Sequence, residues 1–443
     1  MRIKLAALAL FLAGTVNALG ITLDEAVKTA LEKNNLLRAK REEVKEKLYD
    51  YRIAKAHLLP KVDLLSEYNK TTDPPYAIMN RMEVKKLDMF NTDFNDPEKS
   101  QLFKTGLKVT VPVWLGGKLR AAVDLTKKEV KATKEQLKRD ENRVIFDVVK
   151  AYYSVLAAKA FVETAQLAVR DAENHLKTAE AAYRAGIGLK SDVLRAKVYL
   201  EQMEENLVKA KSNYSIALRA LAVAIGEFPG AELSVDGDLT YKPFNFNLND
   251  LIETAIKNRP ELKELKVRLS QTKDMERMAK ADFLPQVGAF GEIFAADDQV
   301  PWDKENSSWM VGVRASINLF SGGEKLYRLR KSRVARLKVK EYEERAKKGI
   351  AFEVSRAYYK FISAQKRVEL ARAAIAAAQE SLRIVEKRYK NGLATITELL
   401  DTQTALNQAR SNYVAALSAY RQAVAEVYYA AGILPKRYHD LVE

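Results

Sequence analysis

The side chains best suited to catalysis or metal binding are few and widely separated in this sequence. The chain has no cysteine, which excludes disulfides, thiolate nucleophiles and cysteine metal sites. Its three histidines, His57, His175 and His439, are isolated from one another, so we expect packing or surface roles for them. GIGLKS at Gly186 lacks the GxxxxGK(S/T) spacing of a phosphate loop and follows a predicted helix rather than a strand. The sequence therefore predicts no enzymatic activity, no metal and no cofactor.

Two carboxylates, Glu398 and Asp401, are three residues apart in a predicted helix, which places both on one helix face. They belong to RYKNGLATITELLDTQ, residues 388–403, where a glycine separates two helical runs. Glycine adopts the left-handed conformation without a side-chain penalty, and the Ser, Thr and Asp residues that follow such glycines are good N-caps. The segment predicts the tip of a helical hairpin, with Gly392 in the turn.

The same tip occurs earlier in the chain. AYRAGIGLKSDVLRAK, residues 182–197, places Gly186 opposite Gly392 and Tyr183 opposite Tyr389, both 206 positions apart. Short predicted helices at 22–34 and 247–262 repeat at a larger offset of 225, as do the prolines in AHLLP and ADFLP. The chain is therefore an internal duplication of one structural unit.

Long helices dominate the predicted fold, which is mainly α with a small β part. Residues 118–185 contain neither Gly nor Pro, and a helix of that length would extend on the order of 100 Å. Apolar residues recur at coiled-coil spacing in register between the copies, with Val148, Tyr152 and Val155 matching Val354, Tyr358 and Phe361.

The apolar period changes from about 3.6 to 2 at residues 103–113 and again at 309–319. Strands with one apolar and one polar face, about 10 residues long, match tilted transmembrane strands. Weaker partners at 61–69 and 286–294 complete one β-hairpin in each copy. A polar stretch at 69–99, which accounts for the 19 extra residues of the first copy, predicts an external loop.

Four aromatic residues sit where an interfacial girdle would need them: Tyr68, Phe103, Phe294 and Trp309. On the opposite face of the last strand, Arg314, Ser316 and Asn318 are expected to face a lumen. An ordinary soluble sheet with one buried face would show the same alternation. Four strands cannot close a barrel, so a membrane barrel would require several protomers.

The N-terminus, MRIKLAALALFLAGTVNALG, has two basic residues, an apolar run and small residues near position 18, which predicts a cleavable secretory signal over residues 1–20. The net charge of +16 could indicate nucleic acid. However, the basic residues alternate with Glu along the helices, and an exported chain rarely meets nucleic acid. We therefore expect no nucleic-acid partner.

The ordered pair of repeats resembles the TolC-like outer-membrane efflux proteins over essentially the whole mature length. Each repeat contains the same elements in the same order: a short helix, a helix that ends at LLP or FLP, a β-hairpin, the motif W/F-x-G-G, a long helix that contains AYY, a tip and a returning helix. The resemblance implies a homotrimer in which each protomer gives four strands to one outer-membrane β-barrel and its helices to one periplasmic α-barrel. It also implies a duct without catalytic activity that works with a periplasmic adaptor and an inner-membrane transporter, in efflux or type I secretion.

By that resemblance, the turns Arg184–Gly188 and Lys390–Ala394 would contact the adaptor. Glu398 and Asp401 match the positions that ring the periplasmic aperture, and Asp192 matches a residue that ties neighbouring hairpins together. Some members have an arginine at the position of Ala394, so a salt-bridge lock of that kind is not expected here.

The implied organisation is a first repeat over 21–226 with a β-hairpin at about 61–114, a linker at 227–246, a second repeat over 247–432 with a β-hairpin at about 286–320, and a tail at 433–443. A periplasmic coiled-coil scaffold or an adaptor without a barrel is the alternative. Either would need the long helices but not two β-hairpins in repeat register.

Overall fold

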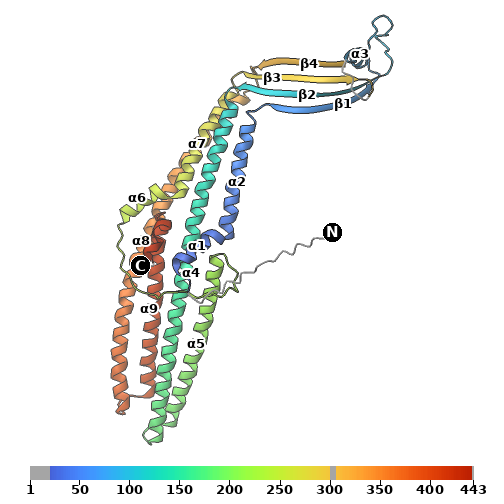
Figure 1. Cartoon of the computed structure of the whole chain (residues 1–443). Helices are drawn as coiled ribbons and strands as arrows, with labels where there is room; N and C mark the ends of the chain where they lie inside the picture. Colours follow the sequence, from blue (N-terminus) through green and yellow to red (C-terminus); the bar gives the residue numbers. More distant parts are fainter. Residues whose placement is uncertain (1–19, 300–305, 442–443) are drawn as a thin grey trace, which may run out of the picture. The chain divides into compact units, whose positions relative to one another are not determined.

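A computed structural model describes residues 20–299 and 306–441 of the chain, so the predicted signal segment lies almost entirely outside the described residues. The structure is mainly helical with one four-stranded sheet (Figure 1). The chain divides into two compact units. Unit 1 contains residues 1–41, 136–262 and 346–443, and unit 2 contains residues 42–135 and 263–345.

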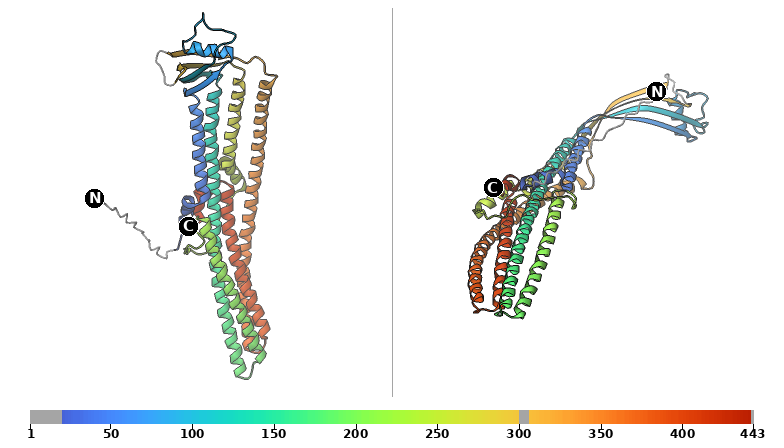
Figure 2. Two further views of the ribbon diagram at one scale, coloured as in Figure 1. Left: turned by 90° about the vertical axis from the view of Figure 1, so that its right-hand side faces the viewer. Right: turned by 60° about the horizontal axis from the view of Figure 1, so that its bottom comes forward.

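Unit 1 is built mostly from two helical hairpins, whose longer helices begin in unit 2. The first joins α4 (Lys118–Arg184) to α5 (Lys190–Ala224), and the second joins α8 (Glu324–Lys390) to α9 (Ile396–Ala430). Within each pair the two helices run side by side (Figure 2). The lengths repeat as the duplication requires, since α4 and α8 each have 67 residues and α5 and α9 each have 35.

Short helices complete the repeats. In unit 1, α1 (Leu23–Lys33) matches α6 (Leu248–Asn258); α2 (Asn35–Ala56) matches α7 (Pro260–Ala281), and both continue into unit 2. Thr22 caps α1 in a capping box with Glu25, and the Asn247 side chain accepts hydrogen bonds at the start of α6. The chain ends in unit 1 with α10 (Leu434–Arg437) and a 3₁₀ turn, η2 (Tyr438–Leu441).

The predicted linker between the repeats is packed rather than free. Ile21 forms a parallel bridge with Val235, and the Tyr420 hydroxyl of α9 donates to the Lys242 carbonyl at 2.8 Å and accepts from the Phe244 N–H. Phe246 meets the Phe361 ring with centroids 4.9 Å apart. Such aromatic contacts supply both apolar area and hydrogen bonding, so this mostly exposed segment packs against the core of unit 1 through a few side chains.

Unit 2 holds the sheet, in which all neighbours are antiparallel and the order is β1-β2-β3-β4. The strands are β1 (Lys61–Thr71), β2 (Ser100–Leu115), β3 (Gln286–Asp297) and β4 (Ser307–Ser316). Among these described strands, only β2 and β3 are paired on both sides in the single chain. The outer edges of β1 and β4 therefore present unpaired backbone N–H and C=O groups.

The register separates two chemically different faces. The polar face carries most of the charged strand residues: Lys61, Asp63, Glu67, Lys104, Lys108, Glu292 and Arg314. The apolar face carries Val62, Leu64, Tyr68, Leu107, Val109, Ile293, Trp309, Val311 and Val313. On the apolar face Leu64, Val311 and Val313 are each at least 70% exposed. An apolar surface of this extent on a single chain indicates a face that something apolar covers.

Three sequence predictions about the sheet are wrong in detail. Phe294 does not join Tyr68, Phe103 and Trp309, because the register places it on the polar face, where Lys104 lies 3.8 Å from its ring centroid. Asn318 lies beyond the last residue of β4. The stretch 69–99 is not wholly a loop, because it contains the helix α3 (Pro74–Glu83), which begins at the Pro74-Pro75 pair.

Ion pairs join α4 to α7 and to Asp282, the residue that follows α7, within unit 2. Lys128 pairs with Asp274 at 2.5 Å, and Lys118 pairs with Asp282 at 2.8 Å. The Asp274 side chain is only 2% exposed, and it also pairs with Arg277 at 3.2 Å, so two basic side chains compensate its buried charge. Among the described residues no helix has an apolar stretch long enough to cross a membrane.

Candidate functional site

The two hairpin tips of unit 1 are built by the same turn. Gly186 and Gly392 have φ angles of +76° and +72°, in the left-handed region that favours glycine. The N–H groups of Gly186 and Ile187 bond to carbonyls of the preceding helical turn, and those of Gly392 and Leu393 do the same. This is the Schellman arrangement, which satisfies the last carbonyls of a helix while reversing the chain.

The helices that leave the tips begin differently. Thr395 caps α9 with a capping box, in which Glu398 accepts from the Thr395 N–H at 3.4 Å and its own N–H bonds the Thr395 hydroxyl at 3.2 Å. The first tip was expected to use Ser191 or Asp192 in this way. There α5 begins at Lys190 after Leu189, which makes no side-chain cap, so that expectation is wrong.

The predicted aperture residues all lie next to the tips. Glu398 and Asp401 are exposed on α9, and among the described residues no side chain pairs with Asp401. Asp192 is half-buried in the first turn of α5. Burial, and then the nearby Asp192 carboxylate, raise the pKa of the Tyr389 hydroxyl at the end of α8. Asp192 therefore lies near Tyr389 of the second hairpin.

Other tip residues predicted from the sequence are open to solvent. Arg184, Gly186, Lys390 and Gly392 are exposed. Gly188 and Ala394 are half-buried, and a Cβ at Gly188 would come within 2.9 Å of the Tyr183 nitrogen. No arginine occupies position 394, and instead Arg195 of α5 donates to the Thr397 hydroxyl of α9 at 3.2 Å.

Three apolar residues at the tips are exposed. The sequence prediction included Ile187 and Leu393 only as members of the turns 184–188 and 390–394, and it did not include Leu189. Ile187 is 84% exposed, and Leu189 and Leu393 are each 67% exposed. A signal for them was present, because Ile187 and Leu393 follow the turn glycines at the same repeat offset. Apolar side chains gathered at an exposed turn are typical of a protein contact surface.

A buried polar network joins the two hairpins behind the tips. Gln403 of α9 is 1% exposed; its Nε2 donates to Asp171 at 3.1 Å, and its Oε1 lies 3.0 Å from Nε2 of His175. Arg410 pairs with the same Asp171 carboxylate at 3.1 Å. Satisfied networks of this kind fix one arrangement of packed helices. Sequence alone could not reveal this network, because the residues of α4 and their partners on α9 are more than 200 positions apart.

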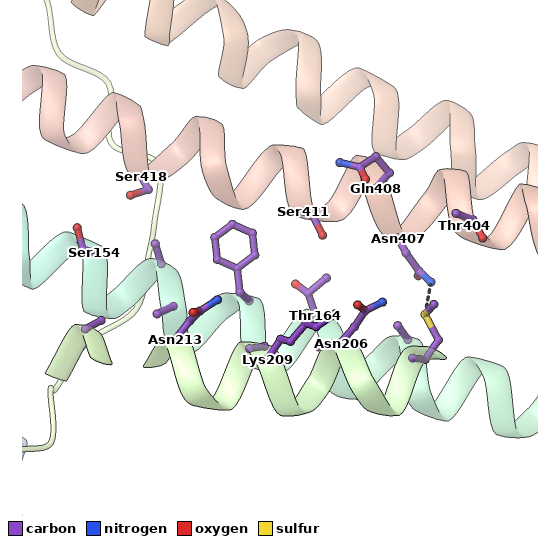
Figure 3. Close-up of a pocket in the computed structure, with 18 residues that line it drawn as sticks. Ser154, Thr164, Asn206, Lys209, Asn213, Thr404, Asn407, Gln408, Ser411 and Ser418 are labelled. Carbon is purple, nitrogen blue, oxygen red and sulfur yellow. Dashed lines mark hydrogen bonds between the residues drawn. The ribbon is translucent and has the colours of Figure 1, made fainter. Parts of the chain in front are cut away.

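Beside this network a groove of about 650 Å³ lies between α4, α5 and α9 (Figure 3). Small residues such as Ala165 and Ala210 line it together with polar residues such as Asn206, Asn407 and Ser411. The basic residue of the described lining, Lys209, pairs with Glu205 at 2.5 Å. That described lining offers no nucleophile beside a base, so the groove has no catalytic arrangement.

The remaining predicted site residues lie in unit 2. Arg314 is on the polar face, with its guanidinium 5.7 Å from the centre of the Phe290 ring, and Ser316 ends β4 on the same face. Asn318 follows in the chain but belongs to no strand. In the described part of the chain no three His, Asp or Glu side chains come together to hold a metal ion.

Comparison with known proteins identifies similar sequences and similar folds among outer-membrane proteins. The family model for outer membrane efflux proteins matches residues 26–227 and 251–433, which covers both repeats. The alkaline protease secretion protein AprF of Pseudomonas aeruginosa is 22% identical over 70% of this chain and 65% of its own length. The outer membrane protein TolC of Salmonella enteritidis is 24% identical over 67% of this chain and 62% of its own length. The chain thus aligns with slightly less than two thirds of either relative.

The fold matches a solved structure over a larger share of the chain. The crystal structure of the CmeC outer membrane channel of Campylobacter jejuni superposes with a TM-score of 0.78, covering 95% of this chain and 89% of that one at 17% identity. The resemblance drawn from the ordered repeats is confirmed. Since the family model accounts for both repeats, this chain belongs to the outer membrane efflux protein family.

Proposed function

We propose that this protein is the outer-membrane channel of a tripartite efflux pump or a type I secretion system, and that it forms the exit duct from the periplasm to the exterior. One observation carries the proposal. A four-stranded sheet with an exposed apolar face and two unpaired edges belongs to the same chain as duplicated helical hairpins with apolar tips.

The sheet supports a barrel shared between chains. Hydrocarbon cannot satisfy the free backbone groups of β1 and β4, so the edges must pair with other copies. Two copies would give eight strands, a size whose interior side chains fill. Three copies, the number that the family resemblance implies, give twelve strands and leave a lumen. We therefore infer a homotrimer with the apolar face toward lipid and the polar face toward the lumen.

A periplasmic coiled-coil scaffold, the alternative left open by the sequence, explains less. It would leave Val311 and Val313, 70% and 72% exposed, in contact with water. It would also leave two strand edges free to aggregate. A lipid-inserted barrel removes both problems at once.

The tips support docking of a periplasmic adaptor, and through it of an inner-membrane transporter. Ile187, Leu189 and Leu393 are exposed at turns whose geometry two left-handed glycines fix. We propose that these apolar residues, with the flanking turns 184–188 and 390–394, form the contact.

The carboxylates support an ion-selective aperture. Threefold symmetry would place three copies each of Glu398 and Asp401 around one axis. Ions farther than ~8 Å are screened at physiological salt, so the six nearest carboxylates outweigh the +16 net charge of each chain. Rings of acidic side chains select cations. We therefore propose a cation-selective resting aperture, with Asp192 holding the two hairpins of a chain together.

The two faces of β4 allow a matched test of the barrel. Val311 and Met310 are neighbours at the same depth, 70% and 50% exposed, on the apolar and polar faces respectively. Val311→Lys should lower barrel stability by about 2–4 kcal/mol, because a lysine at mid-membrane must face lipid, whereas Met310→Lys should have a much smaller effect. Urea unfolding of the protein in lipid vesicles measures both. Equal losses would show that the faces are assigned wrongly.

Docking at the tips is tested at Gly392. Nothing lies within 4 Å of a Cβ added there, so a substitution meets backbone strain rather than a clash. Gly392→Val should abolish transport and cross-linking to the adaptor while the trimer still inserts, because a branched residue tolerates the left-handed region poorly. Gly392→Asn should keep both, since asparagine enters that region more easily. Full cross-linking of the valine variant would place the contact elsewhere.

The aperture is tested by removing charge alone. Glu398→Gln keeps the capping box, which accepts Gln as well as Glu, and Asp401→Asn keeps the shape of the side chain. The double variant should conduct better in planar bilayers and lose most cation selectivity and block by multivalent cations. Glu380→Gln, on α8 where Glu380 pairs with Arg383, is the control and should change neither. A double variant that behaves like the parent would contradict the assignment.

A further inference from the structure

The helix α3 is attached to one particular face of the sheet. The Asn80 amide donates to the Asn69 side chain at 2.6 Å, and Lys104 donates to Glu83 at 3.2 Å. Both strand partners belong to the polar face, since Asn69 pairs with Leu102 and Lys104 pairs with Glu67. The helix therefore lies over the polar face and not over the apolar one.

Further contacts hold the segment after α3 in place. Val84 is 4% exposed and packs with Leu102 and Ala296, which the register also places on the polar face. Lys86 then pairs with Asp298, just after β3, at 2.7 Å. Figure 1 shows α3 at that end of the strands. The C-terminal half of α3 and the residues that follow it are thus docked on strands β1, β2 and β3.

The opposite side of α3 is apolar and uncovered. Tyr76, Met79 and Met82 are 63%, 57% and 59% exposed, and their spacing of three places them on one side of the helix. Ala77 and Asn80, on the other side, are buried against the sheet. We name Tyr76, Met79 and Met82 the α3 stripe. Methionine and aromatic side chains suit adaptable apolar contacts.

We propose that the α3 stripes of three copies meet around the channel axis and form an apolar constriction at the outer mouth. This inference rests on the proposed function, because closing the barrel is what turns the polar face inward. The occupant of the stripe is then a second copy of this chain. Lipid is on the other side of the sheet, where the apolar face lies.

Dimensions support contact between the copies. Twelve strands about 4.8 Å apart and tilted by about 40° close into a cylinder with a radius on the order of 12 Å. A helix with its side chains is about 10–12 Å thick. A helix that lies over the polar face at the end of the strands would therefore reach the axis. Three copies must come into contact there and leave little room for water. Hydrophobic constrictions oppose water and ions by dewetting, so this barrier differs from an acidic ring.

Cross-linking tests the position of α3. The chain has no cysteine, so Met79→Cys introduces a single thiol per protomer. In the detergent-solubilised trimer, oxidation with copper phenanthroline or a short bismaleimide should give a cross-linked dimer. Ile293→Cys, exposed on the apolar face of the central strand β3, is the matched control and should give none. Equivalent outward-facing positions of three copies are far apart.

Conductance tests the constriction. Replacing Tyr76, Met79 and Met82 together with Ser should raise conductance at least about twofold in the Glu398→Gln, Asp401→Asn background, where the first barrier has been weakened. The inference would be overturned if the protein forms a conducting trimer but Met79→Cys gives no cross-link and the triple serine variant leaves conductance unchanged. The proposed function would not be affected by that result. A cross-link that forms in cells only to another protein would overturn the inference too. Failure of the parent chain to form any trimer or pore would overturn both.

Discussion

The unpaired edges of β1 and β4 are the constraint on which the rest of the structure depends. Every backbone N–H and C=O in hydrocarbon needs a partner, and a four-stranded sheet leaves one row unsatisfied on each side. The exposed apolar face makes the same sheet unsuited to water. The proposed closure by three copies would satisfy the edges and cover the apolar face with lipid. In that assembly the polar face, the α3 helix and the acidic tip residues would surround one axis.

The duplication gives the chain two similar halves, but the halves differ at the start of the helix that follows each tip and in the connection between the strands. Both tips share the Schellman turn, but of the two helices that leave them only α9 begins with a capping box. The Glu398 side chain there accepts from the Thr395 N–H, one helical turn before Asp401. The first hairpin connection holds the helix α3 over the polar face. The two barriers proposed for the duct therefore come from different repeats, one charged and one apolar.

The sequence predicted what depends on short-range pattern. Glycine turns, helix lengths, strand periodicity and the order of the repeats are all local, and they were sufficient to identify the family. Long-range pairing was less accessible. The face of the sheet on which Phe294 lies depends on the register of β3 with β2 and β4. The hydrogen bond between His175 and Gln403 joins residues 228 positions apart. The spacing Thr395-x-x-Glu398 is that of a capping box and was visible in the sequence. Glu398 was nevertheless interpreted only as an aperture charge.

The number of chains in the membrane particle tests the account most directly, because closure of the sheet edges requires a definite number of copies. The protein should be extracted from outer membranes in detergent and its mass measured by native mass spectrometry. The account predicts a particle of three chains, with twelve strands from three four-stranded sheets. A stable monomer recovered without detergent, with its strands intact, would contradict it.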